Sequence, residues 1–409
     1  MIFTNLFIRA TSTCLFLALS VQLTSCKKDD DEEPLPSVPS VISCNEITAP
    51  TTWVDKGLAV DYILDCDLIV SDKLTISPNV TIQCRNNSSI TITENGAIAA
   101  IGYSTAPIVM KGEVETPGYW KGIFIQSNNP QNELSYFTIS HGGSASFDGL
   151  SDRKANIRLK FGSKLSLTHS TISYSAQEGI FAEGVDTDLE NPFLNFSENA
   201  FSNNASYPIS IIAASVKTLD VTSVYSANGS QFINVRGGRM VGTHSWKPMV
   251  IPYRIQGIAS VGNYEDFGNL TIEPGVEIRF AGDAGLCTGD YSTGSWMKIL
   301  GTSTNRITLT GVSSLPGAWK GIAFQSTSPE NEIAFTDISF GGSSSYTGNT
   351  NQKANIIAGA WSPGAFNITN STISNSAAWG VYVNLPSPEI SIPPSVTYTN
   401  NASGNYFHE

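Results

Sequence analysis

Apolar residues recur at every second position in short bursts along most of the chain. Clear examples are Leu74/Ile76, Val80/Ile82, Ile90/Ile92, Ile123/Ile125, Leu165/Leu167, Ile209/Ile211 and Val276/Ile278. Alternation of this kind turns one face of an extended segment toward a core and is typical of short β-strands. Between the bursts lie Asn-Gly, Pro-Gly and Gly-Gly pairs and runs of Ser and Asn, which predict turns. No stretch keeps an apolar stripe of helical period for three turns, so no helix is predicted.

Strands this short bury too little surface as isolated hairpins and must be stacked. A chain that winds into coils about 4.8 Å apart pairs each strand in parallel with the strands above and below it. The inward side chains then form one continuous core. At roughly 20–25 residues per coil, residues 58–409 would make about 15 coils. The frequent Ser, Thr and Asn suit the bends, where their side chains bond backbone groups or form ladders between coils.

A long segment of the sequence occurs twice. Gly118–Asn156 and Gly317–Asn355 align without gaps and are identical at 20 of 39 positions. Shorter repeats flank them, at Leu74–Val80 with Leu270–Val276 and at Thr171–Ser173 with Thr372–Ser374. The duplication predicts two β-helix halves, residues 44–240 and 241–409, and leaves open whether they stack into one solenoid. Solenoid ends require caps, for which residues 44–58 and 394–409 are the candidates.

The repeated motifs resemble those of the right-handed parallel β-helix lipoproteins of the phylum Bacteroidota. They are Leu-Thr-Ile-x-Pro-Gly-Val at 270–276, Trp-Lys-Gly-Ile at 120 and 319, Asn-Glu at 132 and 331, Gly-Gly at 142 and 341, and Ser-Thr-Ile-Ser before Gly-Ile at 179 and Gly-Val at 380. The resemblance covers about residue 50 to the end. It implies an all-β, right-handed parallel β-helix, and it is weak for function because this scaffold carries lyases, hydrolases and non-catalytic proteins alike.

The first residues predict an export signal. Residues 1–25 contain one Arg, no acidic residue and an apolar run from Cys14 to Val21, which is shorter than the roughly 20 residues that span a bilayer. The following Leu-Thr-Ser-Cys, ending at Cys26, resembles the lipobox of bacterial lipoproteins. The resemblance implies cleavage before Cys26 and lipidation of that residue, which would anchor the protein to a membrane. An ordinary secretory signal is the alternative.

An acidic and Pro/Ser-rich tether follows over residues 26–43. It begins with the charged residues Lys27, Lys28, Asp29, Asp30, Asp31, Glu32 and Glu33. A charge run is ordinarily a solvated linker. Behind a lipidated Cys, however, this run resembles the tag that exports Bacteroidota lipoproteins, which implies an outer-membrane location facing the cell exterior.

Composition argues against one class of partner. The formal net charge is −12 and no Lys/Arg cluster occurs, whereas nucleic-acid binding depends on a basic surface. The charged fraction of 14% lies below the roughly 25% of ordinary globular domains, as expected for a chain of many short strands and turns.

The cysteines beyond Cys26 suggest one bridge and no zinc site. Cys44 and Cys66 could form a disulfide near the amino-terminal end, although Cys66 also fits the alternation of a buried strand. Cys84 aligns with Phe280 at an inward position, which favours a small buried thiol. The pairing of Cys287 stays open, and no Cys/His spacing is typical of zinc.

The duplicated phrase itself is interpreted as structural. Trp120 and Trp319 could offer sugar-stacking rings, but a large side chain kept at both coil corners favours packing. Glu133 and Glu332 follow the same Pro-x-Asn turn in both copies, and we expect them to bond backbone groups.

No convincing catalytic set is present. The motifs of polygalacturonases and pectate lyases are missing, and His141-Gly142-Gly143 is only a fragment of the former. His169 and His244 lack a Ser or Cys nucleophile motif. The acidic pairs Asp65/Asp67, Asp148/Asp152, Asp186/Asp188 and Asp283/Asp290 are interpreted as solvated surface. Asp65 and Asp67 share one face of a strand and could bind calcium, the one cofactor considered.

These observations favour a surface-exposed lipoprotein that binds glycan or host and matrix material without catalysis. Candidate ligand-binding rings near turns are Tyr103, Tyr119, Tyr291 and Trp296. Two alternatives stay open: a polysaccharide lyase or glycoside hydrolase that acts in a groove along the coil, and a structural spacer.

Overall fold

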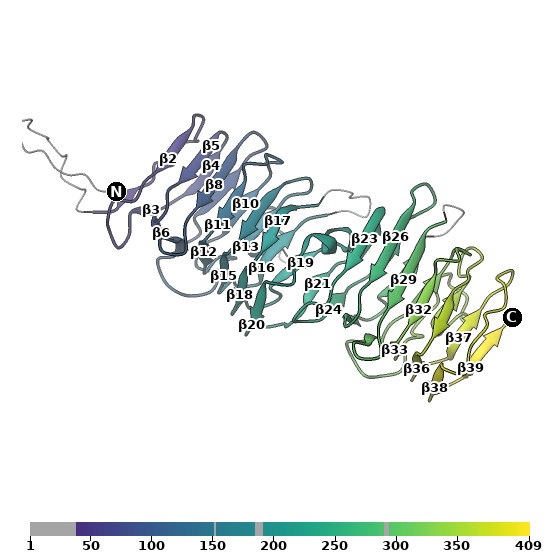
Figure 1. The fold of residues 1–409 in the computed structure, drawn as a ribbon. Helices are drawn as coiled ribbons and strands as arrows, with labels where there is room; N and C mark the ends of the chain where they lie inside the picture. Colours follow the sequence, from purple (N-terminus) through teal and green to yellow (C-terminus); the bar gives the residue numbers. More distant parts are fainter. Residues whose placement is uncertain (1–37, 151–152, 185–190, 290–293) are drawn as a thin grey trace, which may run out of the picture. The chain divides into compact units, whose positions relative to one another are not determined.

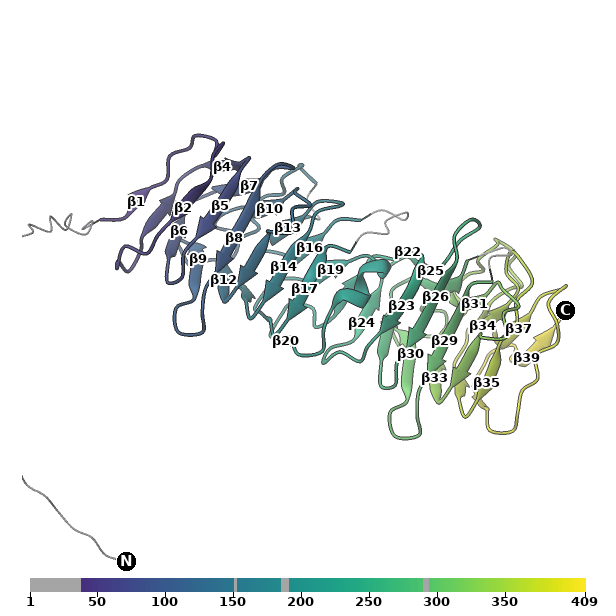
Figure 2. The same cartoon turned by 45° about the horizontal axis from the view of Figure 1, so that its top comes forward.

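The computed structural model describes residues 38–150, 153–184, 191–289 and 294–409. Their strands stack coil upon coil into a parallel β-helix, as the sequence predicts (Figures 1 and 2). We name the five sheets A to E.

Sheet B runs through both copies of the repeat and answers the question of continuity. Its described strands are β4 (Asp67–Val70), β7 (Ser89–Ile92), β10 (Gly122–Ile125), β13 (Ala155–Leu159), β16 (Glu178–Ala182), β19 (Ile209–Ile211), β21 (Ile233–Val235), β24 (Tyr253–Ile255), β27 (Glu277–Phe280), β30 (Ile307–Gly311), β33 (Thr336–Ser339), β36 (Thr372–Ser374) and β38 (Thr397–Thr399). Because each strand is hydrogen-bonded to the next, the two halves belong to one solenoid.

Sheets A and C complete the first half. Sheet A contains β1 (Ser40–Val41), β3 (Tyr62–Leu64), β6 (Thr81–Cys84), β9 (Ile108–Gly112), β12 (Phe137–Ser140), β15 (Thr171–Ser173), β18 (Ala200–Ser202) and β20 (Val224–Ser226). Sheet C contains β2 (Thr51–Trp53), β5 (Lys73–Ile76), β8 (Ala97–Ile101), β11 (Glu133–Ser135), β14 (Leu165–Thr168) and β17 (Phe193–Ser197). From β2 to β19 the chain passes from C to A to B in each coil.

Sheets D and E replace them in the second half. Sheet D contains β22 (Gly238–Met240), β25 (Ile258–Val261), β28 (Gly285–Thr288), β31 (Gly321–Phe324), β34 (Ala354–Ala358), β37 (Trp379–Val383) and β39 (Gly404–His408). Sheet E contains β23 (Gly242–Trp246), β26 (Gly268–Ile272), β29 (Trp296–Leu300), β32 (Glu332–Ala334) and β35 (Asn367–Thr369). Here the chain passes from B to D to E.

Alternation along each strand builds the core. In β6, Ile82 and Cys84 are fully buried while Thr81 and Gln83 are half-buried. The Cys84 thiol is therefore the small buried group that the sequence predicts, and burial raises its pKa. Amide ladders join the coils as well: the Asn204 side chain donates to Oδ1 of Asn228 at 2.9 Å.

The coils are somewhat longer than predicted, since sheet B contains 13 described strands where about 15 coils were expected. Register partners in sheet B are 20 residues apart at Ile233 and Tyr253 but 33 apart at Ile90 and Ile123. The long coils carry loops outside the stack, such as residues 141–154 and 340–353. Alternation reports the strands and not the lengths of the loops between them, which explains the overestimate.

The two copies of the repeat lie on different sheets. The first copy of Trp-Lys-Gly leads into β10 of sheet B, and the second leads into β31 of sheet D. Between β10 and β31 the chain makes seven complete coils and one further segment. The second copy is therefore turned by one sheet about the solenoid axis relative to the first.

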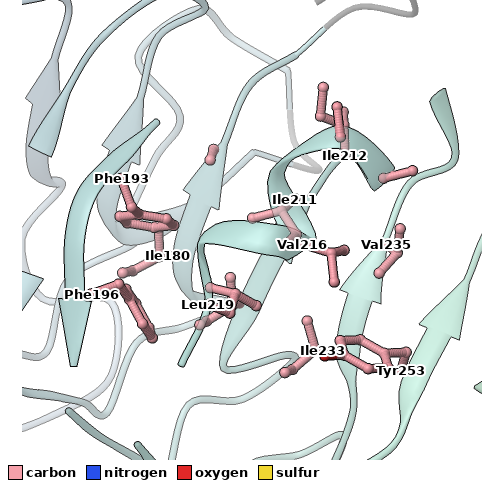
Figure 3. Close-up of a cluster of buried hydrophobic side chains, with 14 of the residues drawn as sticks. Ile180, Phe193, Phe196, Ile211, Ile212, Val216, Leu219, Ile233, Val235 and Tyr253 are labelled. Carbon is pink, nitrogen blue, oxygen red and sulfur yellow. The ribbon is translucent and has the colours of Figure 1, made fainter. Parts of the chain in front are cut away.

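A short 3₁₀ helix, η1 (Ala213–Thr218), takes the place of a sheet C strand between β19 and β20. It contacts β17, β22 and β23, where sheet C ends and sheets D and E begin. Figure 3 shows Val216 and Leu219 of this region packed among side chains of the neighbouring coils, with Phe196 on one side and Ile233 on the other. No helix in the described part of the chain is long and apolar enough to cross a membrane.

The tryptophans of the duplicated phrase pack in the core, as predicted. Trp120 and Trp319 are fully buried, and their indole N–H groups donate to the backbone oxygens of Ser140 and Ser339 at 2.7 and 2.8 Å. The glycine two residues after the tryptophan is required. A Cβ on Gly321, whose φ is +108°, would lie 2.3 Å from the backbone oxygen of Ala354.

Both ends of the core are covered. At the amino-terminal end Ile42, Ile47 and Trp53 pack against the first coils, and Cys44 is disulfide-bonded to Cys66 with their Cα atoms 5.9 Å apart. The sequence left this bridge open. At the other end Ile390 and Val396 cover the last coil, so the cap begins before the predicted residue 394.

Candidate functional site

The predicted ring residues lie in separate places. Tyr103 is 60% exposed on the turn from sheet C to sheet A, whereas Tyr119 precedes β10 and its hydroxyl is 3.3 Å from Glu113. Trp296 begins β29 of sheet E, with its ring 5.0 Å from Nζ of Lys298. Tyr291 lies outside the described residues.

The carboxylates of the acidic pairs that the structure describes form ion pairs or hydrogen bonds with other side chains. Asp65 is paired with Arg85 at 2.6 Å and Asp67 with Lys121 at 2.7 Å. Asp283 accepts hydrogen bonds from two serine hydroxyls, which lower its pKa.

Several predicted features fall outside the described residues. They are the signal peptide, Cys26, the charged residues Lys27 to Glu33, and Asp152, Asp186, Asp188 and Asp290. No group of three or more His, Cys, Asp or Glu side chains that could hold a metal ion occurs in the described ranges.

The histidines and the repeated glutamates are not arranged as a catalytic set. The ring of His141 stacks on Tyr174, and that of His169 stacks on Tyr136. Neither Glu133 nor Glu332 has a side-chain hydrogen bond to a described residue, so the expectation that they bond backbone groups is wrong. The preceding asparagines, Asn132 and Asn331, make those bonds instead.

A groove on the outer surface of the second half has the character of a binding site. It consists of two hollows of about 400 and 620 Å³ that share Gln325. The first is lined by Gly238, Arg239, Ile258, Ser260, Asn263, Cys287, Gly289, Gln325, Tyr346 and Trp361, and the second by Gly294, Gln325, Ser326, Thr327, Ser328, Pro329, Ser362 and Pro363. We call both together the Trp361 groove. Their volumes lie in the range of roughly 300–1,000 Å³ that is usual for ligand sites.

The floor of the groove is an outward row of sheet D. Arg239, Ser260 and Cys287 are in register on β22, β25 and β28. Their neighbours Met240 and Val261 point into the core and are fully buried. Because strand residues alternate between faces, the floor residues point outward.

One wall is the aromatic side chain of Tyr346, from the long loop between β33 and β34. Its hydroxyl donates to the backbone oxygen of Gly321 at 2.7 Å and lies 3.2 Å from that of Leu286. A Cβ on Gly285 would come within 2.1 Å of this hydroxyl, so the glycine makes room for the wall. Burial raises the pKa of Tyr346, which remains a neutral phenol.

The opposite wall is the corner between sheets D and E. The Gln325 side chain donates to the oxygen of Thr288 at 2.9 Å and accepts from the backbone N–H of Trp361 at 3.0 Å. These bonds hold the loop that carries Trp361, whose side chain is 55% exposed. A large ring is thus presented to solvent from a fixed loop.

The described lining combines apolar surface with hydrogen-bonding groups and carries one charge. Arg239 is the only charged side chain among these lining residues, and no described residue forms an ion pair with it. No carboxylate is among the described lining residues, whereas glycoside hydrolysis uses two. The described part of the groove therefore offers a ring face and hydrogen-bonding groups.

Sequence reasoning missed this groove because its parts come from five coils. Trp296 was selected, and in the sequence it lies two residues after Gly294 of the second hollow. Trp361 was not, although it stands among Ser, Pro and Gly residues, a turn signal that the other candidate rings share.

Comparison with protein-family models and with curated proteins finds no match for this chain, so its family is not shown.

Proposed function

We propose that this protein is a lipid-anchored, outward-facing β-helix that binds glycan in the Trp361 groove without cleaving it. The observation that carries the proposal is the exposed ring of Trp361, whose backbone N–H donates to Gln325, beside side chains that can hydrogen-bond. Sugars present apolar C–H faces that pack on aromatic rings and hydroxyls that hydrogen-bond at their edges. An exposed ring beside hydrogen-bonding groups suits both.

The location rests on two independent observations. The segment around Cys26 and its charged run resemble lipoprotein signals, and the disulfide between Cys44 and Cys66 is typical of proteins that fold outside the reducing cytoplasm. Both support an exported protein, and the first supports a lipid anchor.

A glycan array with the purified full chain tests the binding. The panel contains tetrasaccharides of neutral hexoses, N-acetylhexosamines and hexuronates, so it covers ligands that Arg239 would bond through hydroxyls or through a carboxylate. We expect binding to at least one class. We expect Trp361→Ala to weaken it more than tenfold, as the loss of a central aromatic contact of about 2 kcal/mol would.

Tyr103→Ala is the matched control, because Tyr103 is an equally exposed ring on a different corner. Its binding should equal that of the unchanged protein. Loss of binding in Tyr103→Ala with none in Trp361→Ala would move the site away from the groove. If the protein binds no glycan on the panel, a structural spacer becomes the better interpretation. If uronate polymers, with or without calcium, yield shortened or unsaturated products, the polysaccharide lyase or glycoside hydrolase is favoured.

A further inference from the structure

The duplication places a second hollow at the equivalent corner of the first copy, between sheets B and C. It measures about 250 Å³ and is lined by Glu94, Gln126, Asn128, Lys160, Phe161 and Gly162. We call it the Phe161 hollow.

The two corners are built by the same hydrogen bonds. Asn132 donates to the backbone oxygens of Ser127 and Lys164, both at 3.1 Å, and accepts from the N–H of Ile98 at 3.0 Å. In the second copy, the side chain of Asn331 makes the corresponding three bonds at 2.9, 3.0 and 3.0 Å, to Ser326, Ala365 and Met297. The repeated Gln-Ser-x-x-Pro-x-Asn-Glu phrase thus encodes one corner structure twice.

Each corner also carries an exposed ring from the next coil. Phe161 follows β13 and is 47% exposed, and Trp361 follows the equivalent strand β34 and is 55% exposed. Gln126 lines the first corner as Gln325 lines the second. The Gln325 amide is engaged by Trp361 and Thr288, whereas the side chain of Gln126 has no hydrogen bond to a described residue.

We infer that the Phe161 hollow is a second glycan site, so that the protein binds two oligosaccharides at once. The inference rests on the proposed function of the Trp361 groove. Lys160 and Glu94, which line the Phe161 hollow, form an ion pair of 2.9 Å. The local charge is balanced, and the ring, the ion pair and the Gln126 amide offer stacking and hydrogen bonds to sugar hydroxyls.

The two sites are separated along the axis and around it. From β10 to β30, the strand before β31, sheet B advances seven strand spacings, about 35 Å at roughly 4.8 Å each. The second copy is turned by one sheet, so the sites open at different corners. A tetrasaccharide is too short to occupy both, and a long polysaccharide that reaches both gains avidity.

Isothermal titration with the panel tetrasaccharide that gives the strongest array signal measures the number of sites. We expect two per chain in the unchanged protein and one in each of the variants Phe161→Ala and Trp361→Ala. We expect none in the double variant. Tyr103→Ala should keep two, and circular dichroism should show that every variant retains its strand content.

The outcomes separate the two proposals. One site in the unchanged protein, abolished by Trp361→Ala and unaffected by Phe161→Ala, overturns the second site and leaves the first intact. An absence of binding by every tetrasaccharide overturns both. Amide hydrogen exchange in the presence of the same tetrasaccharide gives an independent measurement. We expect slowed exchange at residues 126–132 and 160–164 as well as at 325–331. Slowed exchange at residues 325–331 alone would contradict the inference.

Discussion

The buried side chain of His244 makes stability depend on pH. It is 2% exposed on β23, and its Nε2 lies 2.9 Å from the backbone oxygen of Val241. Burial, together with the positive charge of Lys217, lowers its pKa from the ordinary 6.5 to about 4. The folded state therefore holds a neutral imidazole at pH values where the unfolded chain is protonated.

We expect the free energy of unfolding to fall as pH decreases from above 6.5 toward 4, because the unfolded state binds the extra proton in that window. His244 should account for about 2 kcal/mol of the loss between pH 7.5 and 5.0, at about 1.4 kcal/mol per unit. Urea unfolding at these two pH values measures it. In His244→Gln the difference should shrink by that amount, and an unchanged difference would contradict the assignment.

The substitution Gly285→Ala tests whether Tyr346 is a fixed wall of the groove. In Gly285→Ala the new Cβ would meet the Tyr346 hydroxyl, which must leave its two backbone partners. We expect a loss of about 2 kcal/mol in stability for two such hydrogen bonds and weaker glycan binding. Thermal unfolding and titration measure both.

Gly282→Ala is the matched control for this change, since a Cβ at Gly282 has no atom within 4 Å. It lies three residues away on the same segment and should leave stability and binding unchanged. Equal effects from the two alanines would show that Tyr346 is not responsible.

Individual buried residues could be predicted from the sequence where alternation decides their side. The inward position of Cys84 is confirmed because it continues the alternation of its strand, and the burial of Trp120 and Trp319 is confirmed because both copies keep a large side chain at a coil corner. Exposed residues carry no such signal. Trp361 and Tyr103 both look like turn residues in the sequence, and only the coils around Trp361 give its ring a groove.

At the scale of elements, the disulfide attaches the first cap to the second coil. Cys44 and Cys66 enclose a sequence separation of 22 residues. Closing a loop of that length restricts the unfolded chain and is worth about 3 kcal/mol. We expect the double variant Cys44→Ser/Cys66→Ser to unfold at correspondingly lower denaturant concentration.

A reducing agent supplies the control for this prediction. Dithiothreitol should lower the unfolding midpoint of the unchanged protein to that of the double variant and should have no effect on the variant itself. A midpoint in the unchanged protein that is insensitive to the reductant would contradict a stabilising bridge.

Strands and corners differ in how well the sequence predicts them. Period-two alternation located the strands because every strand faces the same core. The groove and the η1 helix were not predicted because segments of unequal length form them. The contacts that fix the groove join residues more than 30 positions apart, such as Gln325 and Thr288. Spacing within a single segment contains no information about such contacts.

At the scale of the whole molecule, the two copies of the repeat are related by a turn about the solenoid axis. The sequence predicted two similar halves and left open whether they stack into one solenoid. The seven coils and one extra segment between the copies turn the second by one sheet. This shift follows from the number of segments that separate the copies, which alternation does not reveal, and the two copies of the corner therefore lie between different sheets.

The central claim is that a glycan binds on the ring of Trp361, and a crystal structure with bound ligand tests it most directly. Crystals of the full chain would be soaked with the tetrasaccharide that gives the strongest array signal. The account predicts a sugar ring stacked on the Trp361 indole, with polar contacts to floor residues such as Arg239. Sugar density elsewhere on the solenoid, with an empty groove, would contradict it.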